Sequence, residues 1–511
     1  MTSYRLVTAL AAASLCLHAL SGSAGDPSPR RLTVRDCLET ALRENLEIAV
    51  SREDREIARS GVPSAEAAFL PRFTGELSVS RSETPSGSAL TGDLSLDQRV
   101  YRFDLGASTL LRTGTTLSLD FRNLRQESGS AVSLLSPEYD SSLTLSARHP
   151  LLRDAGRETT EAPLWIARAG AEAGDSDFRT RVMDVVAAVR TGFFALHASL
   201  REVEARSTAL ALAERLLART RAEIEAGTRA PVERLPPEAA AAARKEELIR
   251  AEATARNAED DLKTLLGIPS AGDWDRPLLP DLPAGGVEPP GPEDTFEEAL
   301  RRRPELSALA GRTRQSELEE AAARNRILPS LALNASAGLT GLSGTPNPSP
   351  LFPGIAPTFE GDYGDSVDEM LSGRYYTAFL GLSAEIPWTL RKERAEWVRA
   401  KAALARQRLS SESLRAGIRA EVRKARRDLE SAIARIGAAA AAVAAAEASL
   451  DAEEKKRELG AATSTDVLRS QQEVAEALLA RVRAEADARA AQTRLWRSVG
   501  TILTKEGIAI R

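Results

Sequence analysis

The sequence predicts a mainly α-helical protein with a small β part. Long antiparallel helices are expected to form a trimeric helical barrel, joined to a 12-strand transmembrane β-barrel with four strands from each copy. Three observations predict this class: an internal two-fold repeat, helical patterns of unusual length, and short alternating segments between them. A composition rich in alanine, leucine, arginine and glutamate, with only 4% aromatic residues, is typical of long helices and coiled coils.

The repeat is visible as two gapless internal alignments. Residues 41–71 align with residues 299–329, and residues 227–267 align with residues 460–500. Repeats of this kind indicate a quasi-symmetric structural unit. We therefore expect the following segments: a first structural repeat over 25–266, a proline-rich equatorial linker over 267–294, a second structural repeat over 295–500, and a C-terminal tail over 501–511.

The N-terminus has the pattern of a secretory signal peptide, which we assign to residues 1–24. It combines a positive charge, the apolar stretch Leu6–Leu20 and a small-residue cleavage site that ends at Ala24. Lipid attachment at Cys16 is an alternative, although the bulky residue before it fits that pattern poorly. After cleavage only Cys37 remains, so the chain forms no internal disulfide, and we expect this thiol to be a small core residue at a helix start.

Six helical patterns follow, two of them very long. At about 1.5 Å per residue, the long ones span on the order of 100 Å and the others on the order of 50 Å. Capping boxes are expected at Thr33 with Asp36 and at Thr295 with Glu298. The predicted helices are 34–69, 156–226, 231–266, 295–328, 391–459 and 464–500.

The second long helix carries a heptad seam in which positions step by alternating threes and fours. Every second position is alanine, so we expect close approach to a neighbouring helix. A long solvated helix is the alternative, but regular alternation of large and small residues argues against it. The seam positions are Val422, Ala425, Leu429, Ala432, Ile436, Ala439, Val443, Ala446 and Leu450.

Four segments alternate apolar and polar residues over the length that a tilted transmembrane strand needs. Apolar-out, polar-in alternation is required of a membrane barrel around water, whereas a soluble sheet with one buried face gives the same pattern. Their place beside very long helices in an exported chain favours the membrane. The segment 82–139 is expected to be a loop, although Leu94–Arg102 and Thr115–Arg122 are strand-like. The predicted strands are about 72–81, 140–149, 330–340 and 376–386.

Four strands cannot close a barrel, and an open sheet edge in lipid leaves backbone groups without hydrogen bonds. Closure therefore requires several copies. Three copies give 12 strands, within the range of outer-membrane barrels, and six structural repeats in the helical part. Other copy numbers would also allow closure, so the trimer is an inference from this argument.

Several motifs resemble the TolC family of outer-membrane efflux and secretion proteins over about residues 33–500. They are the paired A-L-x-x…L-P starts of the two repeats, the segments Arg303–Leu306 and Arg148–Arg153, and the twin turns at Gly227 and Gly460. Two features depart from the family pattern: Leu46 stands where proline is common, and the segment 82–139 is long.

The resemblance implies an outer-membrane homotrimer that extends into the periplasm. It would dock on a periplasmic adaptor (membrane fusion) protein and, through it, serve an inner-membrane pump of the RND, ABC or MFS class. It would thus be the passive exit duct of a tripartite efflux or type I secretion system.

The resemblance also places a periplasmic gate just past the two turns. Its candidates are Glu233 and Asp466, with Arg469 partly neutralising the constriction; the alternative is that both acids are ordinary first-turn residues favoured by the helix dipole. The turn residues are candidates for adaptor contact or, alternatively, for packing of the hairpins themselves. They are Gly227, Ala230, Val232, Leu235, Gly460, Thr463, Ser464, Val467 and Leu468.

Other functions lack the necessary residues. The net charge of −5 is interspersed, which does not favour nucleic-acid binding. Three histidines and two cysteines form no metal-ligand spacing, no glycine-rich phosphate loop occurs, and we expect neither catalytic residues nor a cofactor. The alternative function is a periplasmic adaptor or coiled-coil scaffold, which would carry one hairpin and no strands of spanning length.

Overall fold

The structure, a computed structural model, describes residues 30–85, 95–130, 132–268, 274–282, 285–347, 358–386, 388–459 and 461–510. The predicted signal peptide, Cys16 and Gly460 lie outside these ranges. The chain forms two compact units. We call them the hairpin unit (Met1–Asn45, Ala188–Val287 and Ala432–Ala490) and the sheet unit (Leu46–Ala187, Glu288–Ser431 and Ala491–Arg511).

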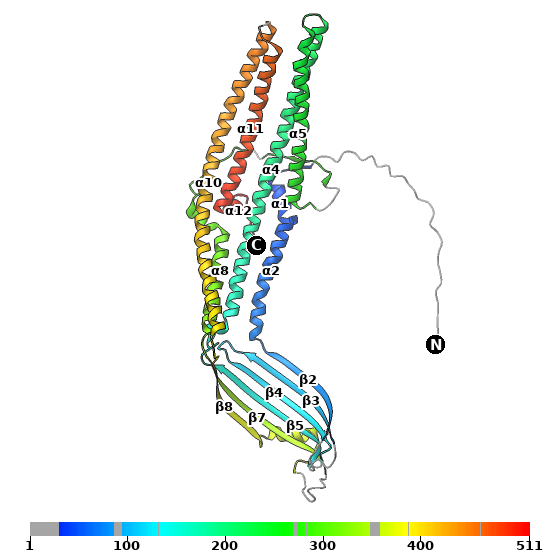
Figure 1. Ribbon diagram of the computed structural model, residues 1–511, viewed down its shortest axis with the longest axis vertical. Coiled ribbons are helices and arrows are strands. Elements are labelled where there is room, and N and C mark those ends of the chain that lie inside the picture. Colours follow the sequence, from blue (N-terminus) through cyan, green and yellow to red (C-terminus); the bar gives the residue numbers. More distant parts are fainter. Residues whose placement is uncertain are drawn as a thin grey trace, which may run out of the picture. The chain divides into compact units, whose positions relative to one another are not determined.

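The fold is mainly helical, as predicted, and two helices are very long: α4 (Ala162–Glu225) and α10 (Arg391–Glu458) each contribute to both units (Figure 1). In the hairpin unit the C-terminal part of α4 runs beside α5, and that of α10 runs beside α11 (Figure 1). The other helices are α1 (Val34–Glu44), α2 (Leu46–Glu66), α3 (Arg157–Thr160), α5 (Leu235–Leu266), α7 (Phe296–Arg302), α8 (Pro304–Asn325), α9 (Tyr363–Ser372), α11 (Ser464–Val499) and α12 (Ile502–Lys505).

The helices predicted as continuous over 34–69 and 295–328 are each broken near their start. Asn45 separates α1 from α2 with an extended ψ of 125°, and its side-chain amide donates to the Leu265 carbonyl at 2.8 Å. Arg303 separates α7 from α8 with a ψ of 117°. There Pro304 explains the break, because the residue before a proline avoids the helical region.

The predicted packing signals appear in the helices. All nine seam positions of α10 are buried or half-buried. Thr33 and Asp36 form a reciprocal capping box, whereas Thr295 accepts from the Glu298 backbone without the return bond. Cys37 is fully buried at the start of α1, as expected.

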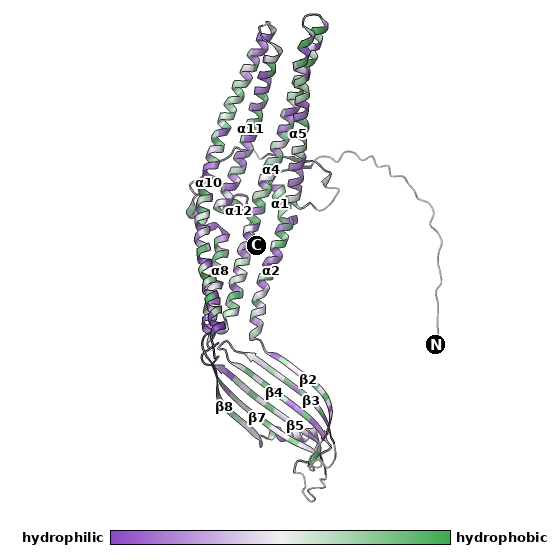
Figure 2. Cartoon of the chain, viewed as in Figure 1, coloured by the Kyte–Doolittle hydropathy of each residue, from purple (hydrophilic) through white to green (hydrophobic). Residues whose placement is uncertain are grey.

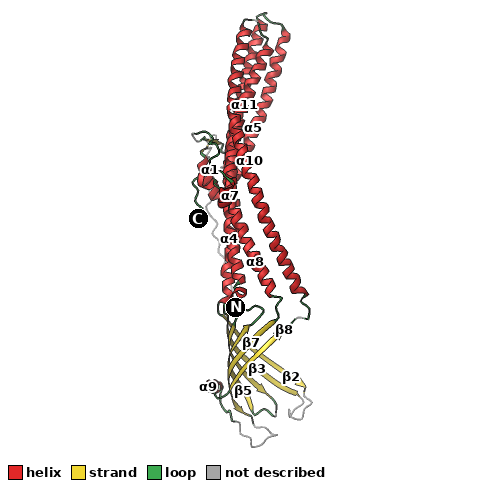
Figure 3. Cartoon of the chain, turned by 90° about the vertical axis from the view of Figure 1, so that its left-hand side faces the viewer, coloured by secondary structure: helices red, strands yellow, loops and turns green. Residues whose placement is uncertain are grey.

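The described residues of the sheet unit form six strands, so the prediction of four strands per copy is wrong. The segment 82–139 contains both additional strands, β3 and β4. The six strands pair antiparallel in the order β2-β3-β4-β5-β7-β8 (Figures 1 and 3). The strands are β2 (Arg72–Pro85), β3 (Ser95–Leu110), β4 (Thr116–Ser128), β5 (Leu135–Pro150), β7 (Ser330–Pro346) and β8 (Tyr376–Glu385). Two further short strands, β1 (Arg30–Leu32) and β6 (Leu278–Pro280), pair in parallel in the hairpin unit.

The pairing of the six strands is continuous across the sheet, and this gives the sheet two different faces. Apolar and polar residues alternate along most of each strand (Figure 2), and the pairing places most of the apolar residues on one face. Exceptions include Asn123 and Arg125 on the apolar face and Phe379 on the polar face. What we call the apolar face includes Phe73, Leu77, Val79, Phe103, Leu105, Leu119, Phe121, Leu143, Leu145, Leu333, Leu339, Leu380 and Leu382. What we call the polar face includes Thr74, Glu76, Ser78, Arg102, Asp104, Asp120, Arg122, Thr144, Ser146, Asn334, Ser336, Thr377 and Ser383.

The short helix α9 covers the apolar face near the end of β5 and β7 that lies away from the other helices (Figure 3). The Ser366 hydroxyl is 2.7 Å from that of Ser141, and the Tyr363 hydroxyl donates to Asn123 at 2.9 Å. A side chain at Gly341 would collide with the α9 backbone at Ser366 and Met370. Glycine is therefore required there for close approach.

Two helices, α4 and α10, each contain an 18-residue window apolar enough to cross a membrane by length and composition alone. Helices that pack in long hairpins also meet this criterion, so it does not by itself place either helix in lipid.

Candidate functional site at the hairpin turns and on the sheet

The first hairpin turn follows the C-terminus of α4. Gly227 has a φ of +74°. The amides of Gly227 and Thr228 donate to the carbonyls of Ile224 and Glu223, each at 3.0 Å. This is a glycine-dependent helix cap, and it reverses the chain into the short 3-10 turn Pro231–Arg234 that leads to α5.

Glu223 is the centre of a charge cluster beside this turn. Its carboxylate lies 2.7 Å from Arg229 Nε and 3.4 Å from Arg457 Nη2, and Arg219 also contacts it at 3.1 Å. Arg457 belongs to α10, so this contact joins the two hairpins within one chain. Local spacing gives no signal for this contact, because the two residues belong to different hairpins.

The predicted gate acid Glu233 lies at the edge of this cluster. It pairs with Arg229 Nη1 at 2.5 Å, and its side chain is 41% exposed. Its charge is thus partly neutralised by an arginine that the sequence analysis did not single out. The i,i+4 spacing of Arg229 and Glu233 could have predicted this ion pair.

The second gate candidate, Asp466, closes a capping box at the start of α11. Its carboxylate accepts from the amide and hydroxyl of Thr463 at 2.9 and 2.6 Å, and its own amide donates to the Thr463 hydroxyl at 3.3 Å. These hydrogen bonds hold the pKa of Asp466 below its usual range, and the charges of Arg469 and Lys456 lower it further. The carboxylate is therefore ionised at neutral pH and acts as a first-turn helix cap. Arg469 is exposed one turn further along α11.

The remaining turn residues differ in exposure. Val232, Leu235 and Leu459 are 66%, 56% and 85% exposed, which leaves apolar side chains in solvent at both turns. Val467 is 2% exposed and packs within the hairpin unit, which is the alternative considered for it. Ala230 and Thr463 are exposed and Leu468 is half-buried, whereas Gly460 and the side chain of Ser464 lie outside the described part of the chain.

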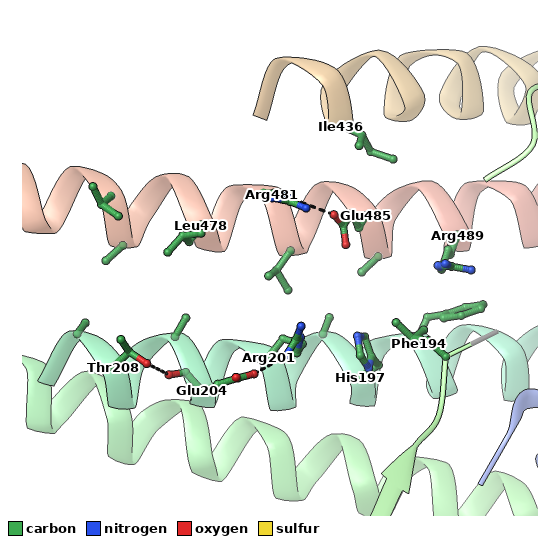
Figure 4. Close-up of a pocket in the computed structure, with 18 of the residues that line it drawn as sticks. Phe194, His197, Arg201, Glu204, Thr208, Ile436, Leu478, Arg481, Glu485 and Arg489 are labelled. Carbon is green, nitrogen blue, oxygen red and sulfur yellow. Dashed lines mark hydrogen bonds and ion pairs between the residues drawn. The ribbon is translucent and has the colours of Figure 1, made fainter. Parts of the chain in front are cut away.

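A cavity of about 670 Å³ lies within the hairpin unit between α4 and α11 (Figure 4). Phe194, His197 and Arg201 line it from α4, and Arg481 and Glu485 from α11, where they form an i,i+4 ion pair at 3.2 Å. Burial and the nearby Arg201 and Arg489 lower the pKa of His197. The cavity wall is therefore mixed apolar and charged.

The sheet has the chemistry of a membrane surface on its apolar face. Five of the six tyrosines of the chain lie toward the end of the sheet away from α2 and α8, on the strands β3, β5 and β8, just before β8, or on α9: Tyr101, Tyr139, Tyr363, Tyr375 and Tyr376. Tyr139 and Tyr363 stack edge to face at 6.4 Å, and Arg125 lies over Tyr101 at 4.9 Å. Tyr376 lies nine residues before the end of β8. Nine residues of a tilted strand rise about 23 Å, close to the height of the apolar band of an outer-membrane barrel, whose rims carry aromatic girdles.

Comparison with known proteins identifies the family to which this architecture belongs. The family model described as "Outer membrane efflux protein" matches residues 37–268 and 295–501. The chain belongs to the outer membrane efflux protein family. It is an outer-membrane channel that extends into the periplasm, and channels of this family work with adaptors and inner-membrane pumps in tripartite efflux systems.

Solved structures agree with this fold. The outer-membrane channel OprN is 19% identical over 92% of this chain and 90% of its own, with a TM-score of 0.65. The Campylobacter jejuni CmeC outer membrane channel is 15% identical over 92% of this chain and 85% of its own, with a TM-score of 0.66. The open state of the Neisseria gonorrhoeae MtrE outer membrane channel is 18% identical over 93% of this chain and 90% of its own, with a TM-score of 0.63. No curated protein sequence matches this efflux channel.

Proposed function

We propose that this efflux channel works as a homotrimer whose copies close the membrane sheet together, and that its hairpin turns form both the inner gate and the docking surface for a periplasmic adaptor. An inner-membrane pump of the RND, ABC or MFS class would deliver cargo through that adaptor. The duct itself is passive, because the proposed gate needs only a change in the contacts between hairpins.

The observation that carries the proposal is the amphipathic sheet with two unpaired edges. β2 pairs with β3 and β8 pairs with β7, while the apolar faces of both edge strands are open, with Leu77 81% and Leu380 74% exposed. An open edge in lipid leaves backbone groups without hydrogen bonds, so other copies must cover it. With six strands per copy, closure alone does not select three copies. The trimer is supported by the family resemblance.

The gate proposal rests on the charges around the turns. In a threefold assembly each carboxylate of Glu233 and Asp466 would be present three times around the axis, and rings of carboxylates attract cations. The contact between Glu223 and Arg457 would hold the two hairpins of each copy together beside that ring. The exposed Val232, Leu235 and Leu459 supply the apolar part of the adaptor surface.

The gate is tested by single-channel recording in planar bilayers. Glu233→Ala combined with Asp466→Ala is expected to raise conductance and to weaken cation selectivity. Thr463→Ala is the matched control, because it breaks the same capping box and leaves the Asp466 charge in place. Unchanged conductance and selectivity in the double variant would retire the gate assignment, and a change shared by Thr463→Ala would assign the effect to the cap.

The assembly and the docking surface have separate tests. Light scattering in detergent is expected to give the mass of three chains, and a dissolved monomer without detergent would contradict the proposal. A photoreactive side chain at Val232 is expected to cross-link a co-expressed adaptor, whereas one at the buried Val467 is not. Equal cross-linking from both sites would remove the docking surface.

A further inference from the structure

We infer that the β3–β4 hairpin is part of the channel wall, so that three copies join β8 of one to β2 of the next in a barrel of 18 strands. The inference rests on the proposed trimer, since six strands from each of three copies give this number. It replaces the 12-strand wall that the sequence predicted. The partner of each sheet edge is therefore a second copy of this chain.

The extra hairpin carries the same two faces as the rest of the sheet. Phe103 and Leu105 of β3 and Leu119 of β4 are 44%, 47% and 44% exposed on the apolar face. Arg102, Asp104, Asp120 and Arg122 of the same two strands lie on the polar face. A loop folded outside the wall would have no reason to present a lipid-like surface in register with β2 and β5. The pattern instead matches lipid on one side and water on the other.

The strand register sets the tilt of the sheet. The row of directly paired residues that begins at Arg72 passes Ser108, Ser118, Ser146 and Ser336 and ends at Phe379. Arg72 starts β2, whereas Phe379 lies six residues before the end of β8 at Glu385. A shift of about 20 Å over five interstrand steps of about 4.8 Å corresponds to a tilt of about 40°, as expected for membrane barrels.

This tilt allows the width of the sheet to be compared with that of the helical layer. Strands inclined at about 40° are spaced about 6 Å apart around a barrel, so six of them cover an arc of about 38 Å. Besides α3, α7, α9, α12 and the end of α11, the described part of the sheet unit holds four longer helix segments: α2, α8 and the N-terminal parts of α4 and α10. At 8–10 Å between axes these cover roughly 32–40 Å. Four strands would cover only about 25 Å, so the six-strand sheet matches the helices whatever the number of copies.

The geometry also permits closure by identical copies. Six is an even number, so β8 of one copy and β2 of the next run antiparallel, like every other neighbouring pair in the sheet. Continuing the same shift of about one residue per strand places Leu380 opposite the stretch Leu77–Val79 of the next copy. The barrel would be about 1.5 times as wide as one of 12 strands, because diameter grows roughly linearly with strand number.

Cysteine cross-linking in outer membranes tests this contact. Two double variants are compared: Leu77→Cys with Leu380→Cys, and Val79→Cys with Leu380→Cys. After oxidation, disulfides between neighbouring copies are expected to give a ladder of linked chains that ends at three copies. The native Cys37 is fully buried and does not compete. Ala335→Cys with Leu380→Cys is the matched control, because these residues pair within one chain and should link without raising the mass.

A second pair distinguishes the two walls. In a four-strand wall β2 would lie beside β5, and Leu77→Cys would link to Leu143→Cys within one chain; in the six-strand wall two strands separate them. That link, in a particle with the mass of three chains, would overturn the inference and leave the proposed trimer standing. A ladder that ends at two copies would overturn both. A Leu77–Leu380 link within one chain, or no link from either edge pair, would likewise overturn the inference.

The width of the pore has its own readout. Deleting residues 95–128 removes β3 and β4 and is expected to reduce the radius of the largest polyethylene glycol that enters from the outer side by about one third. An unchanged cut-off in a deletion variant that still forms trimers would show that the hairpin does not contribute to the wall.

Discussion

Partly buried ion pairs in the sheet unit show how single residues act in this channel. Arg303 and Arg497 both contact Glu305, at 3.0 and 2.7 Å, and Arg497 also contacts Asp184 at 2.6 Å. Burial raises the pKa of Glu305, but the hydrogen bond from Arg303 and the charges of both arginines outweigh it and lower the pKa to about 2. The Arg303–Leu306 segment that carried the family resemblance therefore joins α8 to α11 through charge.

This network predicts a pH-dependent stability. The folded pKa of Glu305 lies below its usual value of 4.5, so its stabilisation is complete above about pH 4.5 and is lost as the pH falls toward 2. Glu305→Gln is expected to lower the free energy of unfolding by about 3 kcal/mol at pH 7, with a smaller difference at pH 3. Urea unfolding in detergent at pH 7 and pH 3 measures this difference in the free energy of unfolding.

Glu39→Gln is the matched control, because its ion pair with Arg35 is exposed and contributes little. A difference between the native chain and Glu305→Gln that is equal at pH 7 and pH 3 would contradict the assigned pKa.

Burial also determines the reactivity of Cys37, since it raises the pKa of this thiol to about 12. We expect no modification by maleimide at pH 8 until the protein unfolds, because the thiolate is the reactive form. Leu459→Cys, 85% exposed, is the positive control. Rapid labelling of Cys37 in the folded channel would show that α1 opens.

At the scale of elements, helix signals were largely visible in the sequence and strand number was not. Capping at Thr33, the seam of α10 and the turn at Gly227 follow from short-range patterns. The capping box at Thr463 and Asp466 has the same T-x-x-D spacing as that at Thr33, so it could also have been predicted from the sequence. The strands β3 and β4 contain strand-like stretches, but whether such stretches join a sheet depends on neighbours that only the fold supplies.

The break at Asn45 predicts the effect of a proline after it. Leu46 is the first residue of α2 and is 74% exposed, so Leu46→Pro removes no helical hydrogen bond and is expected to raise the free energy of unfolding by about 0.4–1 kcal/mol. Val50→Pro, inside the same helix at another exposed site, should lower it by about 3 kcal/mol. Thermal unfolding followed by circular dichroism compares the two proline variants with the native chain. Equal losses of stability in both variants would mean that α1 and α2 behave as one helix.

At the scale of the whole molecule, the two faces of the sheet decide how the channel meets the membrane. Leu77→Arg places a charge on the apolar face and is expected to cost about 2–4 kcal/mol and to lower the amount of channel in the outer membrane. Ser78→Arg, one residue away on the polar face, should be tolerated. Quantitative blotting of membrane fractions measures both, and equal losses would contradict the assignment of the faces.

The sequence by itself determined the helical class, the long hairpins and the helix caps, because these depend on periodicity and spacing within short windows. Its motifs carried the resemblance to the outer-membrane family, which the family model confirms. Only the tertiary structure decided that six strands rather than four form the sheet and that Glu223 and Arg457 join the two hairpins. These features arise from contacts between segments far apart in the chain, and backbone pairing and buried charge are settled by the partner that each group meets in space.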